Sequence, residues 1–455
     1  MIVVVGAGPA GTAAALAAAD AGASVVLLDN APRAGGQYDR RSLVGRHSPA
    51  PGEAALDAHP RIDHRPRTSV WALEPDGPDG ILVHTQQGPA DAARPVRTLR
   101  ASALILCTGA YDRAFPFPGW ELPGVITAGA AQALVKGQGI APGGRTVLSG
   151  TGPFLLPVAS ALLSVGADIA GVYEAGSPTG WLRSPLTALR DGRSKLPELA
   201  AHAATLARHR VPYRTRTAVV AAHGSDRVES VTLARLRRDW TVRSRRRVAA
   251  DTVCVGYGFT PQLELAVAAG CALRDERFVA VDEAQATSVP GVYAAGEITG
   301  IGGAELAVAE GEVAGAAAAH GLAGAAPAAG PVRPGRRAAA RVRSGRRFAA
   351  ALAAAHPVRP GWRSWLTDAT LVCRCEEVTY ADLRAAVEDR GADGMRALKL
   401  TSRAGLGACQ GRVCGRTAAE LAGVPESHRR PLAQPVRLGD LGSREQPQDP
   451  YPGGQ

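Results

Sequence analysis

Apolar residues in the first thirty positions form two short unbroken runs with a stretch of small residues between them. Residues 2–5 and 25–28 are entirely apolar, which is typical of strands buried on both faces of a parallel sheet. The Ala-rich stretch from Pro9 to about Ala21 predicts a helix. The order strand, helix, strand therefore predicts a βαβ unit at the start of the chain.

The turn between the first strand and the helix carries the pattern G-x-G-x-x-G. Gly6 allows the tight turn, and Gly8 lets a pyrophosphate approach the backbone. Gly11 lets the helix pack close to the strand, and Pro9 suits the first helical turn. Asp29 ends the second strand, where an acid holds a ribose hydroxyl. Together these positions predict a dinucleotide site.

Later segments extend this site. Residues 103–109 predict a further strand of the parallel sheet, and residues 291–315 predict a strand, a Gly/Glu turn and a small-residue helix that complete it. Residues 68–101 alternate and predict an antiparallel meander. The cofactor contacts expected beyond the first turn are Gly36, Gln37, Thr108, Gly109, Gly296 and Glu297. Residues 30–106 contain no cysteine, which excludes dithiol chemistry on this domain.

A second βαβ unit begins near residue 144. Gly150, Gly152 and Pro153 repeat the first three positions of the motif at an offset of 144 residues. The repeat indicates a second dinucleotide-type domain, inserted in the first.

The second unit departs from the first in two places. Leu155 takes the third-glycine position, which should push helix and strand apart, and Tyr173 falls where Asp29 stands. Glu174 follows one residue late, so it faces the ribose only if the strand register slips. Two interpretations stay open: a tentative nucleotide site at Gly150, Gly152 and Glu174 for NAD(P) or ATP, or a duplicated unit kept as scaffold.

Cysteines divide into two groups. Cys107, Cys254 and Cys271 stand alone in apolar contexts and are expected in the core. The other four form a C-x-C and a C-x4-C pair, which predicts a metal site of four thiolates: Cys373, Cys375, Cys409 and Cys414. Zinc and iron–sulfur clusters both fit this inventory, and a set of thiols without a metal is a third alternative. The C-x-C half disfavours zinc and favours [2Fe–2S].

The surroundings of the four cysteines agree with a cluster. Thr379 and Asp382 predict a capping box at the start of a helix over residues 380–387. Glycine loops and nearby cations would stabilise the negative charge of a thiolate-bound cluster. The cations in question are Arg374, Lys399, Arg403, Arg412 and Arg416.

Charge and composition exclude other classes. The net charge is +11, but aromatic residues make up only 4% and no base-stacking or groove-binding motif is present, so no nucleic-acid partner is expected. The Arg-rich hairpin over residues 236–247 is interpreted as solvated. No apolar run reaches membrane-spanning length. With the first strand starting at residue 2, we expect a cytoplasmic protein, with any membrane association made through partners.

The predicted fold class is α/β, with two Rossmann-like dinucleotide-binding domains and a small helical C-terminal [2Fe–2S] domain. The boundaries follow the patterns above: 1–115 and 250–325 for the first domain, 116–249 for the second, 326–364 for a linker with a basic helix, 365–423 for the cluster domain, and 424–455 for a tail whose last dozen residues are expected to be disordered.

The motifs resemble known families. CRCEEVT with TSRAGLGACQGRVCG resembles the bacterioferritin-associated ferredoxin-type [2Fe–2S] domain. The order GAGPAG, GGQ, PFPGWELPGV, GTGPFLLPVA, GYGFTP, AGEITGIGGAELAVAEG, CRCEEVT resembles the flavoprotein family that includes the A subunits of opine oxidases and the B subunits of hydrogen cyanide synthases. It is also similar to the α subunits of D-hydroxyproline dehydrogenase, dye-linked proline dehydrogenase and sarcosine oxidase.

This resemblance implies a fold like glutathione reductase, with FAD, or in some relatives another adenine nucleotide, at the first motif. It implies that Glu297 takes the position of the acid, usually Asp, that holds the FAD ribityl chain. It further implies a heteromeric complex in which an amino-acid-oxidase-like flavoprotein subunit oxidises the amine or imino acid, often with FMN between the subunits. Leu155 and Tyr173 depart from the pattern and speak against NAD(P).

The expected function is an electron-transferring subunit of a heteromeric amine or imino-acid dehydrogenase or oxidase, of opine, hydroxyproline, proline or sarcosine type. A flavin accepts two electrons and a [2Fe–2S] cluster carries one, so a chain with both converts between them. The sequence offers no general base for amine oxidation, so catalytic residues and the final electron acceptor stay unassigned. The alternatives are a stand-alone NAD(P)H-dependent reductase that uses its cluster, and a non-enzymatic binding module.

Overall fold

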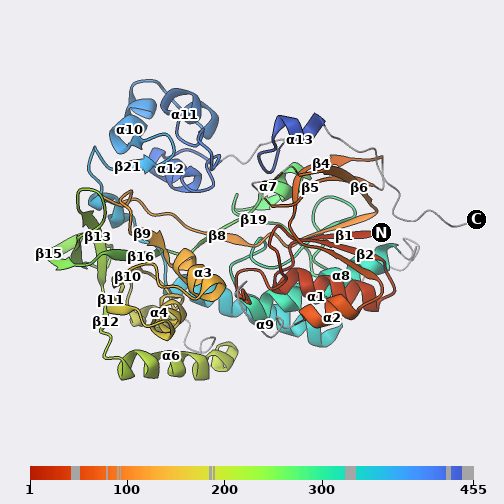
Figure 1. The fold of residues 1–455 in the computed structure, drawn as a ribbon, viewed down its shortest axis with the longest axis horizontal. Helices are drawn as coiled ribbons and strands as arrows, with labels where there is room; N and C mark the ends of the chain where they lie inside the picture. The colour runs from red at the N-terminus through yellow and green to blue at the C-terminus, as the bar shows by residue number, and fades with distance from the viewer. Residues whose placement is uncertain are drawn as a thin grey trace, which may run out of the picture.

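Two five-stranded parallel sheets form the centre of the computed structural model (Figure 1). The structure describes residues 1–41, 52–77, 80–89, 92, 94–183, 187, 190–322, 335–426 and 432–442. The predicted disorder of the last dozen residues concerns positions outside these ranges. None of the helices in the described ranges is apolar over a length that would cross a bilayer.

The first sheet has the order β20-β7-β1-β2-β3, with all pairs parallel. Its strands are β1 (Ile2–Val5), β2 (Val25–Leu28), β3 (Ile62–Arg65), β7 (Ala103–Leu106) and β20 (Val292–Ala294). The predictions that residues 103–106 join this sheet and that a strand after residue 291 completes it are confirmed. The first domain therefore draws on two parts of the chain far apart in sequence.

Successive residues of β1 face opposite layers, which explains why its apolar run is unbroken. Ile2 and Val4 pack on α1 (Pro9–Asp20) and α8 (Ala304–Leu322). Val3 and Val5 face the antiparallel sheet predicted from the alternating residues. That sheet consists of β4 (Thr68–Pro75), β5 (Ile81–Gln87) and β6 (Val96–Ala101). The short helices α2 (Glu53–Ala58) and α7 (Glu264–Ala268) lie at the margins of these layers.

The second sheet is also parallel, in the order β12-β11-β10-β16-β9. Its strands are β9 (Val125–Thr127), β10 (Arg145–Gly150), β11 (Asp168–Glu174), β12 (Tyr213–Thr215) and β16 (Thr252–Gly256). The expected boundary at residue 250 is wrong here, because β16 pairs with β10 instead of joining the first sheet. Buried apolar strands look alike in sequence, so the pattern of residues 252–256 does not say which sheet they join.

The layers of the second unit repeat those of the first. Three helices cover one face of its sheet: α3 (Ala128–Gln138), α4 (Leu155–Ser164) and α6 (Leu196–Arg208), the last preceded by the short helix η2 (Arg193–Lys195). An antiparallel sheet covers the other face, formed by β13 (Thr217–His223), β14 (Ser230–Leu236) and β15 (Val242–Ala249). The Arg-rich hairpin connects the central strand β14 to the edge strand β15, and residues 243–247 are exposed as predicted.

Two short strands join the units. β8 (Ala110–Asp112) follows β7, and β17 (Phe259–Pro261) follows β16, and the two pair antiparallel. The chain beyond β17 returns to the first unit through β18 (Leu273–Arg274) and β19 (Phe278–Val279). Residues 110–112 and 259–261 are therefore the link between the two sheets, and we call them the link strands.

The C-terminal third begins with α9 (Arg336–Ala355), the predicted basic helix, which packs on α8 and on η1 (Pro178–Arg183). The turn η4 (Pro360–Trp365) leads into the cluster domain. That domain holds β21 (Leu371–Cys373), β22 (Val378–Thr379), α10 (Tyr380–Glu388), α11 (Met395–Ser402) and α12 (Gly415–Ala422). The capping box of Thr379 and Asp382 is confirmed. The short helix α13 (Leu438–Gly442) lies beyond it, over the meander (Figure 1).

Glycines let α1 and α8 touch backbone to backbone. A Cβ on Gly311 would lie 2.1 Å from the carbonyl oxygen of Ala10, and one on Gly315 would lie 2.1 Å from that of Ala14. We expect Gly311→Ala to separate the two helices and cost roughly 1–3 kcal/mol, the usual penalty of overpacking. Denaturation followed by flavin release should show this loss. The helical control Gly439→Ala meets nothing within 4 Å and should leave the midpoint unchanged; an equal midpoint for both variants would contradict the packing account.

Candidate functional site: two dinucleotide units and a four-cysteine cluster

The first glycine motif folds as its sequence predicts. A Cβ on Gly6 would lie 2.3 Å from the Cys107 oxygen, and one on Gly11 would lie 1.7 Å from the Gly6 oxygen. Helix α1 begins directly after Gly8, with Pro9 in its first turn. The free amides of this turn, with the helix dipole behind them, form a ready anion site. The loop carrying Gly36 passes so close that a Cβ there would lie 2.9 Å from the Gly8 Cα.

Asp29 lies at the end of β2, beside this loop. Its Oδ2 accepts a hydrogen bond from the Ala7 amide at 2.5 Å, and its Oδ1 accepts one from the Ala31 amide at 2.6 Å. Burial raises the pKa of the carboxyl, while these two backbone bonds oppose the rise. A carboxylate has about four acceptor positions, so one on each oxygen remains for the paired hydroxyls of a ribose.

The other predicted cofactor contacts surround the same edge of the sheet. The Glu297 carboxylate accepts a hydrogen bond from the Gly303 amide at 2.8 Å, in the loop that precedes α8, and burial raises its pKa. Gly296 has a positive φ, and a Cβ there would lie 2.9 Å from the Ala10 Cβ. The loop after β7 is fixed because the Thr108 hydroxyl donates to the Gln262 oxygen at 2.7 Å.

Gln37 and Gly109, two further predicted cofactor contacts, have different surroundings from the residues above. The Gln37 side chain accepts a hydrogen bond from Arg40 on the surface. Gly109 has a positive φ with open space around it, at the point where the chain leaves β7 for β8. The structure therefore brings the predicted residues of the first unit to one edge of one sheet. Which of them touch a cofactor stays a proposal.

The register of the second unit does slip. Thr146 pairs with Ile169 and Val147 pairs with Gly171, so β11 carries one extra residue, Ala170, as a bulge. This places Glu174 opposite Gly150 at the end of the strand pair. The bulge shifts every later residue of β11 by one position, so Glu174 takes the place in the second unit that Asp29 takes in the first, although it comes one residue later in the sequence.

The turn and helix of the second unit differ from those of the first. Helix α4 begins only at Leu155, two residues after Pro153, and its N-cap Phe154 has helical torsions and no capping side chain. Leu155 is fully buried and packs on Gly256. Gly11 leaves no room for a Cβ in the first unit, so a leucine at the same place requires the helix to start farther back.

The four cysteines of the cluster domain lie together. The Cys414 thiol contacts those of Cys373 and Cys409, and Cys409 contacts Cys375. The Cys414 thiol donates hydrogen bonds to Cys373 and Cys409, and these bonds raise the pKa of Cys414. The same bonds lower the pKa of Cys373 to about 6 and that of Cys409 to about 4. Amides of the surrounding loops also donate to the sulfurs, those of Gly405 to Cys373 and Gly411 to Cys409 among them.

This donor set fits a two-iron cluster. Among the described residues, no group of three or more Cys, His, Asp or Glu side chains has an arrangement that could hold a single metal ion. The four thiols form one continuous chain of contacts and together supply the four thiolates that a [2Fe–2S] cluster needs, two for each iron. The loop presses close, since a Cβ on Gly407 would lie 2.3 Å from the Cys375 Cβ. Cys107, Cys254 and Cys271 are buried elsewhere, as predicted.

The cations near the cysteines have a further role that their spacing did not reveal. Arg412 pairs with Glu264 at 2.8 Å, and Arg416 donates to the Phe259 oxygen at 2.9 Å. Arg374 donates to the Glu121 oxygen at 3.2 Å. Each of these contacts joins the cluster domain to the dinucleotide units, so three of the five cations hold the domains together. Arg403 instead pairs with Glu376 inside the cluster domain.

Several docking residues were missed by sequence reasoning. The Thr417 hydroxyl donates to the Ala114 oxygen at 2.9 Å, and the Trp120 indole donates to the Leu371 oxygen at 2.6 Å. Buried Arg113 pairs with Glu420. The partners are 251 to 307 positions apart, so no local pattern marks them. Only the aromatic and charged residues that follow β8 in PFPGWELPGV could have hinted at an interface.

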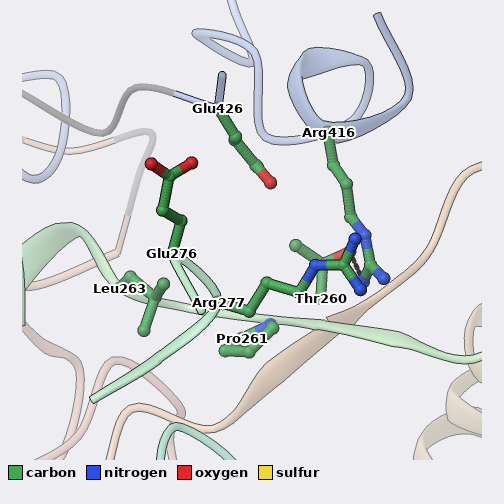
Figure 2. A pocket seen from close by; sticks show the side chains of 7 residues that line it. All are labelled: Thr260, Pro261, Leu263, Glu276, Arg277, Arg416 and Glu426. Atoms are coloured by element: carbon green, nitrogen blue, oxygen red, sulfur yellow. Dashed lines mark hydrogen bonds between the residues drawn. The ribbon is translucent and has the colours of Figure 1, made fainter. Parts of the chain in front are cut away.

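A shallow depression opens where the cluster domain meets the link strands (Figure 2). Figure 2 shows the guanidinium groups of Arg277 and Arg416 beside each other next to Thr260, with Glu276 directed away from them. Burial, then the charges of Arg113 and Arg277, lower the pKa of Arg416 to about 10. The lining holds two arginines and two glutamates, so its charges balance and the pocket is no dedicated anion site.

Comparison with known proteins follows the same division of the chain. Residues 1–321 match the family described as pyridine nucleotide-disulphide oxidoreductase, and residues 371–422 match the BFD-like [2Fe–2S] binding domain. Among solved structures, L-proline dehydrogenase from P. horikoshii aligns with a TM-score of 0.67 over 97% of this chain and 78% of that one, at 17% identity. Thioredoxin reductase from T. acidophilum aligns at 0.51 over 71% and 98%, at 25% identity.

These matches define a flavin-dependent oxidoreductase with an iron–sulfur domain. The chain belongs to the pyridine nucleotide-disulphide oxidoreductase family, in the group that contains the A subunits of opine oxidases. Among these A subunits, that of Agrobacterium tumefaciens (strain Ach5) is 34% identical to this chain, over 97% of this chain and 91% of that one. HcnB, a component of the hydrogen cyanide synthase of Pseudomonas aeruginosa, is 33% identical over 90% of each chain.

The cluster assignment predicts two irons and two sulfides per chain. We expect Cys409→Ser to lose the cluster but keep the flavin, because the thiols lie in a separate domain from the first glycine motif. Iron, sulfide and flavin analysis of the purified variant measures both. Cys271→Ala, which removes a buried thiol elsewhere, should keep all three; zinc in place of iron in the unmodified protein would refute the assignment.

Asp29 and Glu174 provide a matched pair for the dinucleotide site. We expect Asp29→Ala to weaken flavin binding by roughly 1–3 kcal/mol, the cost of leaving buried polar groups unpaired. Glu174→Gln, at the same place in the second unit, should leave flavin content unchanged. Equilibrium dialysis of the apoprotein with FAD would show both effects. Loss of flavin in Glu174→Gln alone would show that the flavin binds to the second unit instead.

Proposed function

We propose that this chain is the electron-transferring subunit of a heteromeric amine or imino-acid dehydrogenase. It holds FAD on the first glycine motif and a [2Fe–2S] cluster on the four cysteines, and it receives electrons from a separate flavoprotein subunit that oxidises the substrate. The observation that carries this proposal is the docking of the cluster domain on the link strands, directly beyond the loop that ends the first dinucleotide site.

Only a short segment of chain separates the loop of the first dinucleotide site from the residue that contacts the cluster domain. Gly109 ends the loop after β7, and Ala114, which accepts the hydrogen bond from Thr417, is five residues farther on. Five residues span at most about 18 Å when fully extended. Thr417 lies in the first turn of α12, which starts directly after Cys414. This short path supports the proposal that electrons pass between the two sites within one chain.

The residues divide the work between them. When bound, the flavin takes two electrons at once and releases them singly to a one-electron cluster. Asp29 and the glycine turn orient its adenine nucleotide half. Glu297, which accepts a hydrogen bond from the Gly303 amide, binds the ribityl chain of the FAD in this proposal. The loop amides around the cysteines stabilise negative charge on the sulfurs.

The relatives support a partner. The A subunits of opine oxidases, HcnB and the alpha subunits of sarcosine oxidases are all named as components of larger enzymes. The match to the sarcosine oxidase alpha subunit of Corynebacterium sp. (strain P-1) covers 70% of this chain and 32% of that one, at 28% identity. We infer a partner that resembles amino-acid oxidases, acts on an amine or imino acid, and shares an FMN with this chain at their interface.

This function predicts a division of labour that can be measured. The isolated chain should not oxidise an opine, a cyclic imino acid or an N-methyl amino acid. Co-expression with an amino-acid-oxidase-like subunit should produce substrate-dependent dye reduction. In that complex, Cys373→Ser should slow transfer to the acceptor at least about tenfold while the partner's flavin is still reduced by substrate. Cys271→Ala serves as the thiol control.

Two results would contradict the proposal. One is oxidation of an amine by the isolated chain. The other is NADH-driven dye reduction by the isolated chain at about 10 per second, the turnover of an ordinary enzyme, which would favour the stand-alone reductase.

A further inference from the structure

The second dinucleotide unit has a complete strand–helix–strand framework and an acid in the ribose position, yet its ribose end is covered by the chain itself. Helix α9, from the segment between the flavin and cluster domains, lies between the two units (Figure 1). Its C-terminal residue is Ala355, and His356 directly follows. The contacts around His356 and Glu174 decide whether a nucleotide can enter.

Glu174 is almost fully committed to its own chain. Its Oε1 accepts from the Thr151 hydroxyl and from the Gly176 amide, each at 2.8 Å. Its Oε2 accepts from the Gly152 amide at 2.8 Å. Three of about four acceptor positions are therefore filled, and Oε1 has none left. A ribose presents two neighbouring hydroxyls, and Asp29 in the first unit keeps one position on each oxygen for them.

His356 occupies the remaining space. Its Nδ1 lies 3.9 Å from the Glu174 Oε1, and the glycine that should admit a pyrophosphate, Gly152, would place a Cβ 4.0 Å from the His356 Cβ. The Trp181 ring stands edge-on to the imidazole, with centroids 5.7 Å apart. His356 therefore lies beside both the acid and the glycine turn.

Several contacts fix the helix that carries this histidine to the second unit. Arg347 and Ser344 both donate to Asp191, at 3.0 and 2.7 Å. Phe348 lies 6.0 Å from Trp181, ring to ring. A Cβ on Gly180 would lie only 2.1 Å from the Ala355 oxygen, so η1 and the end of α9 are in backbone contact.

The same helix is anchored to the first unit. Arg346 pairs with buried Glu310 of α8 at 2.9 Å, and Arg341 pairs with Glu312 at 2.7 Å. Glu310 itself accepts from the Gly296 amide and the Thr299 hydroxyl, next to the predicted flavin site. Helix α9 therefore contacts both units and connects one to the other.

We propose that α9 and His356 close the second dinucleotide unit and exclude NADH and NADPH from it. His356 is the specificity-determining residue, because it fills the position of the ribose beside Glu174. Electrons then enter the chain from elsewhere. The inference stands on these contacts and does not depend on the identity of the partner.

Isothermal titration of the flavin-loaded protein with NADH and NADPH tests this proposal. The unmodified chain should show no binding up to about 1 mM, the upper end of ordinary Michaelis constants. The double variant His356→Ala/Arg347→Ala should bind with a Kd at least about tenfold below that limit. Gly180→Ala, which pushes the end of α9 away without touching His356, should act in the same direction. Arg343→Ala, an exposed arginine of the same helix, is the control and should not bind.

Adding Glu174→Gln to the double variant should abolish the gained binding, which assigns it to the second unit. Binding to the unmodified chain that Glu174→Gln removes would overturn the proposal. So would a folded, flavin-loaded double variant and a folded Gly180→Ala variant that gain nothing. Because binding is measured directly, nucleotide binding alongside intact partner-dependent amine oxidation would overturn this inference alone and leave the proposed function standing.

Discussion

Backbone carbonyls of the link strands and their flanks hold the cluster domain in place, and the arrangement of both redox sites depends on this contact. Phe259 and Ala114 supply carbonyl oxygens to Arg416 and Thr417, which follow the last cysteine by two and three residues. Hydrogen bonds to carbonyls fix position without requiring a matching side chain. The cysteines are consequently placed relative to the dinucleotide sheets by the path of the backbone.

Local patterns were sufficient to predict most of the fold. The unbroken apolar runs, the glycine turn and the capping box each have one physical cause within a few residues, so the first sheet, α1 and α10 could be derived directly. The sequence could not predict which sheet residues 252–256 join, because an apolar strand has the same pattern in either sheet. Pairing there is decided by the whole fold.

The sites show the same limit. Asp29 and the four cysteines could be predicted from spacing, since their proposed chemistry depends on short-range geometry. Glu174 appeared one residue late because a bulge at Ala170 leaves no clear mark in sequence. No pattern in the sequence marked His356 as a residue of the second site. Its role arises from a helix that starts 162 residues after Glu174 and returns to it, and only the folded chain brings the two together.

Electron transfer between the two redox centres within this one chain is the central claim, and flash photoreduction of the flavin tests it most directly. With no partner or nicotinamide nucleotide present, freeze-quenched samples would be followed by EPR for the reduced [2Fe–2S] cluster. The account predicts that the cluster signal grows as reduced flavin decays, faster than about 10 per second, the turnover of an ordinary enzyme. Reduced flavin that persists beside an oxidised cluster, and reacts only with added dye, would contradict it.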